Sequence, residues 1–197
     1  MDQLNHSEPV ALARALAKPL ASAAEEIERT RRIPEPLLTQ LHDAGLFRML
    51  LPEELGGGEV EPGIYVTVLE ELARHDASVA WNLFVANSAA LIAPYMDEGA
   101  AAKVFSNPRT VVAWGPPHKG LAEAAAGGYR VSGRWDFASG CRQANWMGVH
   151  CRVKEADGSL RLNSSGHPTF RTLLFPADQA TLYDTWDTIG LRGTASD

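Results

Sequence analysis

Apolar residues recur at helical spacing in the first hundred residues and at strand spacing afterwards. Leu12, Leu16, Leu20 and Ile27 fall on one face of a 3.6-residue period. Pro19 interrupts this pattern, because proline in a helix interior removes a backbone hydrogen bond and clashes with the preceding turn. The pattern therefore predicts an amphipathic helical segment with a kink or break near Lys18-Pro19.

Proline and aspartate mark the starts of further helices. Residues 34–41 read as a short helix that Gly45 stops. Pro62 opens another helix, whose predicted apolar face carries Val66, Leu69 and Leu72. Two more helix starts are predicted, one at Asp76 or Ser78 and one at Asp97, where a side chain can accept from the first backbone N–H groups.

The stretch 77–94 carries no formal charge and approaches the length of a membrane span. It contains Ser78, Asn82, Asn87 and Ser88, and Pro94 ends it. This polar content favours a buried central helix over a membrane-spanning one.

After Asn107-Pro108 the pattern changes to short β-branched and aromatic runs between Gly, Pro, Asn and Asp clusters. The strand candidates are 110–114, 121–126, 129–132, 146–153, 171–175 and 182–183. Their close spacing favours an antiparallel meander or barrel, because parallel crossovers need a dozen or more residues. The predicted fold class is α+β, with an all-α helical domain over 1–108 followed by an antiparallel β-barrel-like domain over 109–197.

Composition narrows the function classes. The net charge of −6 without a basic cluster argues against nucleic acid as a partner. The two cysteines, Cys141 and Cys151, have no CxxC spacing and are expected to be free thiols in a reducing cytoplasm. The beginning of the chain does not resemble a signal peptide. The six histidines show neither HxxxH nor HExxH spacing, so no metal site is expected.

The most informative stretch is 127–140, a glycine turn, an alternating strand, a second turn and a run of small residues. Small residues after an aromatic run let a backbone come close to a flat ligand. Phe137-Ala138-Ser139 offers backbone N–H groups and a hydroxyl for hydrogen bonding; the alternative is a plain turn. Trp114, at the end of a predicted strand, either lines such a ligand or packs in the core.

Two more polar residues are candidates for the substrate side of a site. Asn87 lies on the uncharged helix and needs a partner, which is either a ligand or, as we favour, the backbone. His118 follows Trp114 in a predicted loop and is either a site residue or an ordinary surface residue.

Three landmarks in this order resemble the acyl-CoA dehydrogenase superfamily of flavoproteins. They are Leu-Pro-Glu-Glu-Leu-Gly-Gly at 51–57, the stretch 127–140, and Trp-Asp-Thr-Ile-Gly-Leu-Arg-Gly-Thr at 186–194. The helices at 70–74 and 77–81 are also similar, so the resemblance runs over nearly the whole chain. It implies the family's N-terminal helical domain followed by its β middle domain.

Within that superfamily, the sequence Gly-Gly-Tyr-Arg-Val-Ser-Gly-Arg-Trp at 127–135, followed by Phe-Ala-Ser-Gly at 137–140, looks more like the flavin-dependent monooxygenase branch. Enzymes of that branch are the oxygenase components of two-component systems. Such an oxygenase takes reduced FAD or FMN from a partner reductase and hydroxylates a small-molecule substrate. The resemblance implies that Trp114, Phe137, Ala138 and Ser139 border the flavin. Asn87, where that branch often has a histidine, and His118 would then lie on the substrate side.

The family also has a third, four-helix domain, which carries the catalytic base and builds the oligomer. No residue of this chain matches it, so the catalytic residues are unknown and a truncated, oligomer-forming product is expected. Two alternatives stay open. One is an acyl-CoA dehydrogenase that binds FAD and desaturates an acyl-CoA; the other is an inactive two-domain fragment that acts only by association.

Overall fold

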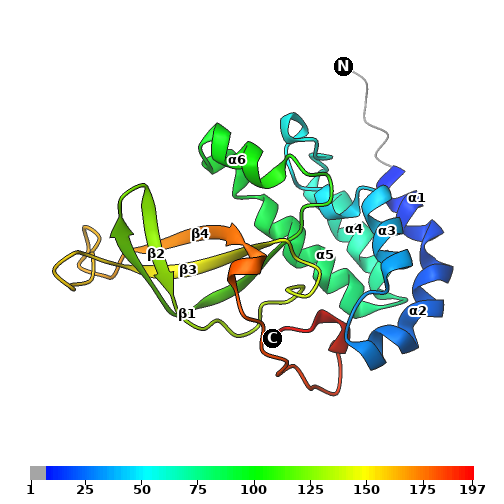
Figure 1. Ribbon diagram of the computed structural model, residues 1–197. Coiled ribbons are helices and arrows are strands. Elements are labelled where there is room, and N and C mark those ends of the chain that lie inside the picture. The colour runs from blue at the N-terminus through cyan, green and yellow to red at the C-terminus, as the bar shows by residue number, and fades with distance from the viewer. Residues whose placement is uncertain (1–7) are drawn as a thin grey trace.

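The structure, a computed structural model, describes residues 8–197, with the backbone alone at 117–119. Within these residues, six α-helices pack beside one four-stranded sheet (Figure 1). The helices are α1 (Glu8–Ala15), α2 (Ala17–Thr30), α3 (Glu35–Asp43), α4 (Pro62–Ala73), α5 (Ala77–Ala90) and α6 (Glu98–Phe105). The strands are β1 (Val112–Ala125), β2 (Gly128–Ser132), β3 (Trp146–Lys154) and β4 (Phe170–Pro176).

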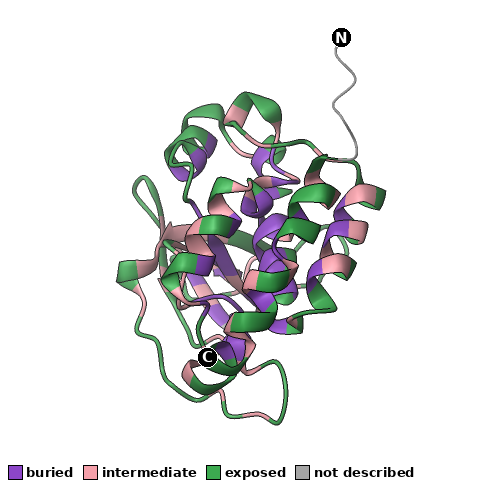
Figure 2. Cartoon of the chain, turned by 90° about the vertical axis from the view of Figure 1, so that its right-hand side faces the viewer, coloured by how far each residue is buried: buried purple, intermediate pink, exposed green. Residues whose placement is uncertain are grey.

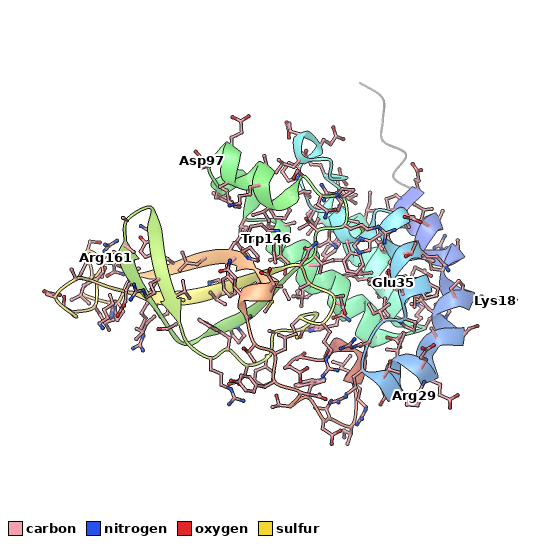
Figure 3. The ribbon with its side chains drawn as sticks, viewed as in Figure 1. Lys18, Arg29, Glu35, Asp97, Trp146 and Arg161 are labelled. Carbon is pink, nitrogen blue, oxygen red and sulfur yellow. The ribbon has the colours of Figure 1, made fainter. Side chains whose placement is uncertain are left out.

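The predicted break in the first amphipathic segment is present, but it lies at Leu16, between α1 and α2. Pro19 falls in the first turn of α2, where its missing N–H would have no helical partner in any case. Leu20 and Ile27 are fully buried in the core, as the pattern predicts. Figure 3 shows Lys18 and Arg29 on the outer side of α2, pointing away from the core.

The predicted apolar face of α4 is only partly right. Leu72 is buried, but Val66 is 55% exposed, and Tyr65 and Val68 take the buried positions instead. The buried stripe is shifted by one residue at these positions, because apolar residues stand on most sides of this helix and leave the phase ambiguous. The two predicted aspartate caps are confirmed: Asp76 accepts from Val79 N at 2.8 Å, and Asp97 accepts from Gly99 N at 3.0 Å.

Helix α5 is the central helix of the fold. It packs against α4 on one side and β1 on the other, and most of its residues are buried (Figure 2). By length and composition alone, Ala77–Tyr95 could cross a membrane, but 61% of that window is buried inside the fold. In this structure the stretch is a core helix, as its polar residues predict.

The sheet has the strand order β2-β1-β3-β4 and is mixed rather than antiparallel. The β1–β2 and β3–β4 pairs are antiparallel, whereas β1 and β3 are parallel. The antiparallel prediction is wrong for that pair because residues 126–145, which contain β2, are long enough for a crossover. Residues 182–183, predicted as a strand, are not in one, and the four strands do not close a barrel.

Strand β1 joins two predicted strands into one long strand with a bulge. Gly115 pairs with Val149 and Gly120 with Cys151, so residues 116–119 stand opposite His150 alone. Prolines cannot donate to a ladder, which is why Pro116 and its neighbour are accommodated in the bulge. Trp146, at the start of β3, lies where the sheet meets the helices (Figure 3).

Two glycines, Gly120 and Gly133, make room for the Trp135 side chain. A Cβ atom at Gly120 would lie 2.6 Å from Trp135 Cζ2, and one at Gly133 would lie 2.9 Å from Trp135 Cη2. The indole also hydrogen-bonds His150 O through Nε1 at 3.3 Å. Trp135 thus fills the space that these two glycines leave, and the expectation that the small residues after Phe137 border a flat ligand stays a prediction.

Gly120→Ala is expected to lower the free energy of unfolding by about 1–3 kcal/mol, because the new methyl group overpacks a site without free space. It would also lie 2.8 Å from Cys151 Sγ and 2.9 Å from the backbone oxygen of His150. Urea denaturation measures the change. Gly63→Ala is the control, since nothing lies within 4 Å of its Cβ position, and a control loss equal to that of Gly120→Ala would contradict the argument.

Residues 184–197, which we call the strap, run back from the sheet to the end of α2 (Figure 1). Asp197 anchors it: Oδ1 accepts from Thr185 N and Trp186 N, each at 2.7 Å, and Oδ2 accepts from the Arg142 guanidinium at 2.7 Å. Burial disfavours the charged form of Arg142, but hydrogen bonds to Asp197 and Asp184 outweigh it and raise its pKa. The strap is thus held by a satisfied, buried ion pair.

The α+β fold class is confirmed. The change from helices to strands falls between Phe105 and Val112. The division into domains at residue 108 stays a prediction.

Candidate functional site

An apolar pocket of about 320 Å³ opens where α5, β1, the turn after β2 and the strap meet. Its walls are the aromatic rings of Trp81, Phe84, Trp114, Phe137 and Trp186. One edge is polar, because the hydroxyl-bearing residues Ser139, Thr194 and Ser196 lie there. Among the described lining residues none is charged. Flat, apolar walls with one hydrogen-bonding edge suit a planar heteroaromatic ligand.

Trp114 reaches the pocket because side chains alternate along β1, so that Trp114 and Pro116 point to one face and Gly115 to the other. Its ring meets the His150 imidazole edge-on, with centroids 5.2 Å apart. Burial lowers the pKa of His150, so this neighbour is neutral at pH 7. The Trp114 Nε1 donor is buried and finds no partner among the described residues. A buried donor of this kind calls for a partner.

Backbone strain gathers at the pocket. Phe137, Leu191 and Ala195 have positive φ angles of 63°, 54° and 40°, which non-glycine residues rarely adopt. Two of them line the pocket and the third lies between Thr194 and Ser196. Strained residues persist only where the surroundings hold them, and they cluster at ligand sites. Phe137 is also 57% exposed, and its ring meets that of Trp186 edge-on with centroids 5.9 Å apart.

Ser139 is nearly buried, and its hydroxyl is already bonded within the protein. It accepts from Trp81 Nε1 at 3.0 Å and lies 2.6 Å from Ser196 Oγ. Ala138 does not line this pocket; it faces a second hollow of about 760 Å³ on the opposite face of the sheet. Of the four residues predicted to border a flavin, the structure therefore brings Trp114, Phe137 and Ser139 together in one pocket.

The two predicted substrate-side residues do not join them. Asn87 is fully buried behind the pocket: its Nδ2 donates to Leu46 O at 2.8 Å and to Leu83 O at 2.9 Å. Its Oδ1 accepts from Leu50 N at 3.1 Å, so the backbone is its partner. The side chain of His118 lies outside the described residues.

Sequence reasoning missed eight lining residues: Trp81, Phe84, Val85, Pro116, Trp186, Leu191, Thr194 and Ser196. Trp81 and Phe84 stack on each other, with centroids 5.1 Å apart, at an (i, i+3) spacing on α5. That spacing on an uncharged helix was a usable signal for an aromatic pair on one face. Trp186 and Leu191 stand in the landmark at 186–194, but only the fold brings the strap beside α5.

Both cysteines are buried free thiols. Burial raises the pKa of each to about 11, from an ordinary value of 9.0. Among the described residues, no group of three His, Cys, Asp or Glu side chains could hold a metal ion.

These thiols are expected to react slowly with a thiol reagent at pH 8 in the folded protein and at once after unfolding. The unfolded state loses its thiol protons from about pH 9, whereas the folded state keeps them until about pH 11. The thiols' contribution to the free energy of unfolding is therefore fully present below pH 9 and falls as the pH rises towards 11. Ellman's reagent with and without denaturant, and urea melts across that range, measure both effects. Rapid labelling of the native protein at pH 8 would contradict the burial argument.

Comparisons with known proteins agree with the family resemblance of the sequence. The family model "Acyl-CoA dehydrogenase, N-terminal domain" matches residues 8–104. The oxygenase component of FADH(2)-dependent resorcinol hydroxylase from Rhizobium sp. (strain MTP-10005) is 34% identical over 89% of this chain and 41% of its own length. Indole-3-acetate monooxygenase from Pseudomonas putida is 32% identical over 87% and 42%. The structure of XiaF from Streptomyces sp. in complex with FADH2 and glycerol matches with a TM-score of 0.88 at 26% identity, over 97% of this chain and 47% of that one.

The chain thus spans less than half the length of each of these three proteins, although each of them matches nearly all of it.

Proposed function

Because this chain belongs to the acyl-CoA dehydrogenase superfamily, we propose that it supplies the flavin-facing part of the oxygenase component of a two-component flavin-dependent monooxygenase. The observation that carries the proposal is the apolar pocket. It gathers Trp114, Phe137 and Ser139, the residues for which the family resemblance implies contact with a flavin.

The residues present fit a flavin ring system. Its planar faces match the aromatic walls, and its heteroatom edge matches the hydroxyls of Ser139, Thr194 and Ser196. Trp114 is partly buried, and its indole ring adds a flat apolar surface to the same walls. A pocket of about 320 Å³ is within the ordinary range for ligand sites and accommodates the ring rather than a whole dinucleotide.

When bound, a reduced flavin supplies the electrons that activate dioxygen for insertion of one oxygen atom into a substrate. The part of this chain is to bind and orient: Phe137 and Trp114 border the ring, and Ser139 contacts its polar edge. The aromatic walls also exclude bulk water, which protects reactive species from hydrolysis. Trp81 and Phe84, stacked on each other on α5, add further aromatic surface to the pocket, which suits a planar small-molecule substrate.

The relatives' names support this reading over the dehydrogenase alternative, since they name an oxygenase component and a monooxygenase. A separate flavin reductase as partner, a homo-oligomer and a cytoplasmic location are parts of the same proposal. FAD and FMN both remain candidates for the flavin.

Titration of the purified chain with FMN and with FAD, oxidised and chemically reduced under anaerobic conditions, tests the proposal. We expect calorimetry to detect saturable binding of at least one of these flavin forms. No uptake at tens of micromolar by a folded chain would overturn it and favour a fragment that acts by association only.

A matched pair of variants locates the binding. Phe137→Ala removes a wall of the pocket and is expected to weaken flavin binding about threefold to tenfold. Phe170→Ala is the control, because Phe170 is 50% exposed on β4 and does not line the pocket. Equal effects of the two variants would place the flavin elsewhere.

A further inference from the structure

Trp186 is the aromatic wall of the pocket that the strap supplies. Residues 181–188 belong to no helix or strand, so no regular hydrogen-bond pattern of the backbone fixes the direction of this ring. The other indole walls, by contrast, lie on regular elements, Trp81 on α5 and Trp114 on β1. The position of the Trp186 ring therefore depends on the contacts that its own polar groups make.

Each polar group of Trp186 has a partner. Its backbone N–H donates to Asp197 Oδ1 at 2.7 Å, and its indole Nε1 donates to Leu191 O at 3.0 Å. Its backbone carbonyl accepts from Arg31 Nη1 at 2.6 Å. The first two partners belong to the strap itself, whereas Arg31 comes from the helical part of the fold. This third bond thus ties the ring to a fixed element outside the strap.

Arg31 stands directly after the last residue of α2, in the left-handed conformation with φ 56°. Helices commonly end on a residue of this conformation, but it is usually glycine, because a side chain crowds the backbone there. Non-glycine residues in this region are held by their surroundings and gather at functional sites. The Arg31 side chain is 21% exposed, so it lies against the protein rather than in solvent.

Asp184 fixes the orientation of the Arg31 guanidinium. Nη1 lies 2.7 Å from Asp184 Oδ1, and Nη2 lies 2.7 Å from Oδ2, which is the two-point geometry that sets the plane of an arginine. Hydrogen bonds from Arg142 and Arg31 lower the pKa of Asp184, which is therefore ionised at pH 7. With its plane set in this way, the guanidinium directs Nη1 at the Trp186 carbonyl.

We propose that Arg31 is a positioning residue of the pocket: by bonding the Trp186 carbonyl, it holds the indole as a wall against the planar ligand. The inference rests on the proposed function and goes beyond it, because Arg31 is 155 residues from Trp186 in the chain and does not line the pocket. The Trp186 ring also meets that of Phe137, with centroids 5.9 Å apart, so a displaced Trp186 would leave Phe137 without this neighbour.

Arg31→Met and Arg29→Met form a matched pair of variants. Both remove a guanidinium near the end of α2, but Arg29 is exposed and points away from the core (Figure 3). Arg31→Gly is a second test, because glycine adopts the positive φ without strain and this variant is expected to fold even where Arg31→Met does not. Trp186→Ala removes the ring itself.

The first measurement needs no flavin. The chain has five tryptophans, so labelling with fluorotryptophan gives one ¹⁹F NMR resonance for each, and Trp186→Ala identifies the resonance of Trp186. Both Arg31 variants are expected to shift or broaden that resonance and to leave the Trp135 resonance in place, whereas Arg29→Met should move neither. An unmoved Trp186 resonance in both Arg31 variants would overturn the proposal, whether or not the chain binds flavin.

The second measurement is the affinity for lumiflavin, an uncharged flavin ring without phosphate, so that a lost arginine charge cannot act through a phosphate group. Each Arg31 variant is expected to bind lumiflavin about threefold to tenfold more weakly, and Arg29→Met as tightly as the unaltered chain. Combined with Trp186→Ala, the Arg31 substitutions should cause no further loss. A general loosening of the fold would weaken binding in that background as well.

The two measurements separate the possible failures. A displaced Trp186 resonance with unchanged lumiflavin affinity would overturn the proposal, because the ring would then be held by Arg31 without serving as a wall. Binding of no flavin by the folded, unaltered chain would overturn the proposed function and the ligand part of this inference. The ¹⁹F resonance would still decide whether Arg31 fixes the Trp186 ring.

Discussion

Replacing Asp197 by alanine is expected to lower the free energy of unfolding by about 3–5 kcal/mol, the usual effect of breaking one side of a buried ion pair. The Asp197 side chain is 1% exposed and the Arg142 side chain 11%. Its loss leaves the backbone N–H groups of Thr185 and Trp186 without an acceptor and Arg142 with Asp184 as its remaining carboxylate partner. Urea denaturation followed by tryptophan fluorescence measures the change.

Asp187→Ala is the matched control on the same strap. Its carboxylate is 79% exposed and bonds Arg192 at 2.7 Å, and exposed ion pairs contribute little. A small effect of Asp187→Ala beside a large effect of Asp197→Ala would follow from burial. Equal small effects would mean that the strap is not anchored at Asp197.

Asn87→Ala is expected to lower the free energy of unfolding by about 2–4 kcal/mol, because it leaves the Leu50 N–H and the Leu46 carbonyl unpaired in a buried place. Affinity of the folded chain for flavin should not change, since Asn87 does not line the pocket. Thermal melts and a flavin titration of the same preparation separate the two effects. A stable variant that binds flavin more weakly would restore the substrate-side role suggested by the sequence.

Ser88→Ala is the control for Asn87. Its hydroxyl bonds only Val85 O, one turn back on the same helix, at 2.8 Å. Removing that bond leaves no group from another part of the chain without its partner. The free energy of unfolding is therefore expected to change by well under about 1 kcal/mol.

The helices and their caps were predictable because the signals for them are local. Asp76 and Asp97 bond backbone groups two or three residues ahead, so the sequence alone indicates their roles. The phase of α4 and the parallel pairing of β1 with β3 were not predictable in this way. Both depend on partners that are distant in sequence, and local periodicity says nothing about which partner a face or an edge will meet.

The candidate site shows the same division. Trp114, Phe137 and Ser139 were found because they stand beside turn and strand-end signals. The α5 wall was missed, because the exposed face of a helix that carries no charge looks like its buried face in sequence. Thr194 belonged to a recognised landmark and Ser196 stands two residues after it, but the contact of Ser196 with Ser139 depends on the strap, which lies 57 residues further along the chain.

The strap also determines when this fold can be completed as the chain is made. Arg31, at the end of α2, bonds Asp184 across 153 residues. On a ribosome that adds about 5–20 residues per second, Arg31 is synthesised roughly 8–30 s before Asp184. During that interval the face of Ile27 that Gly193 later covers is open to water. The helical half therefore keeps this apolar face uncovered until the strap has been synthesised.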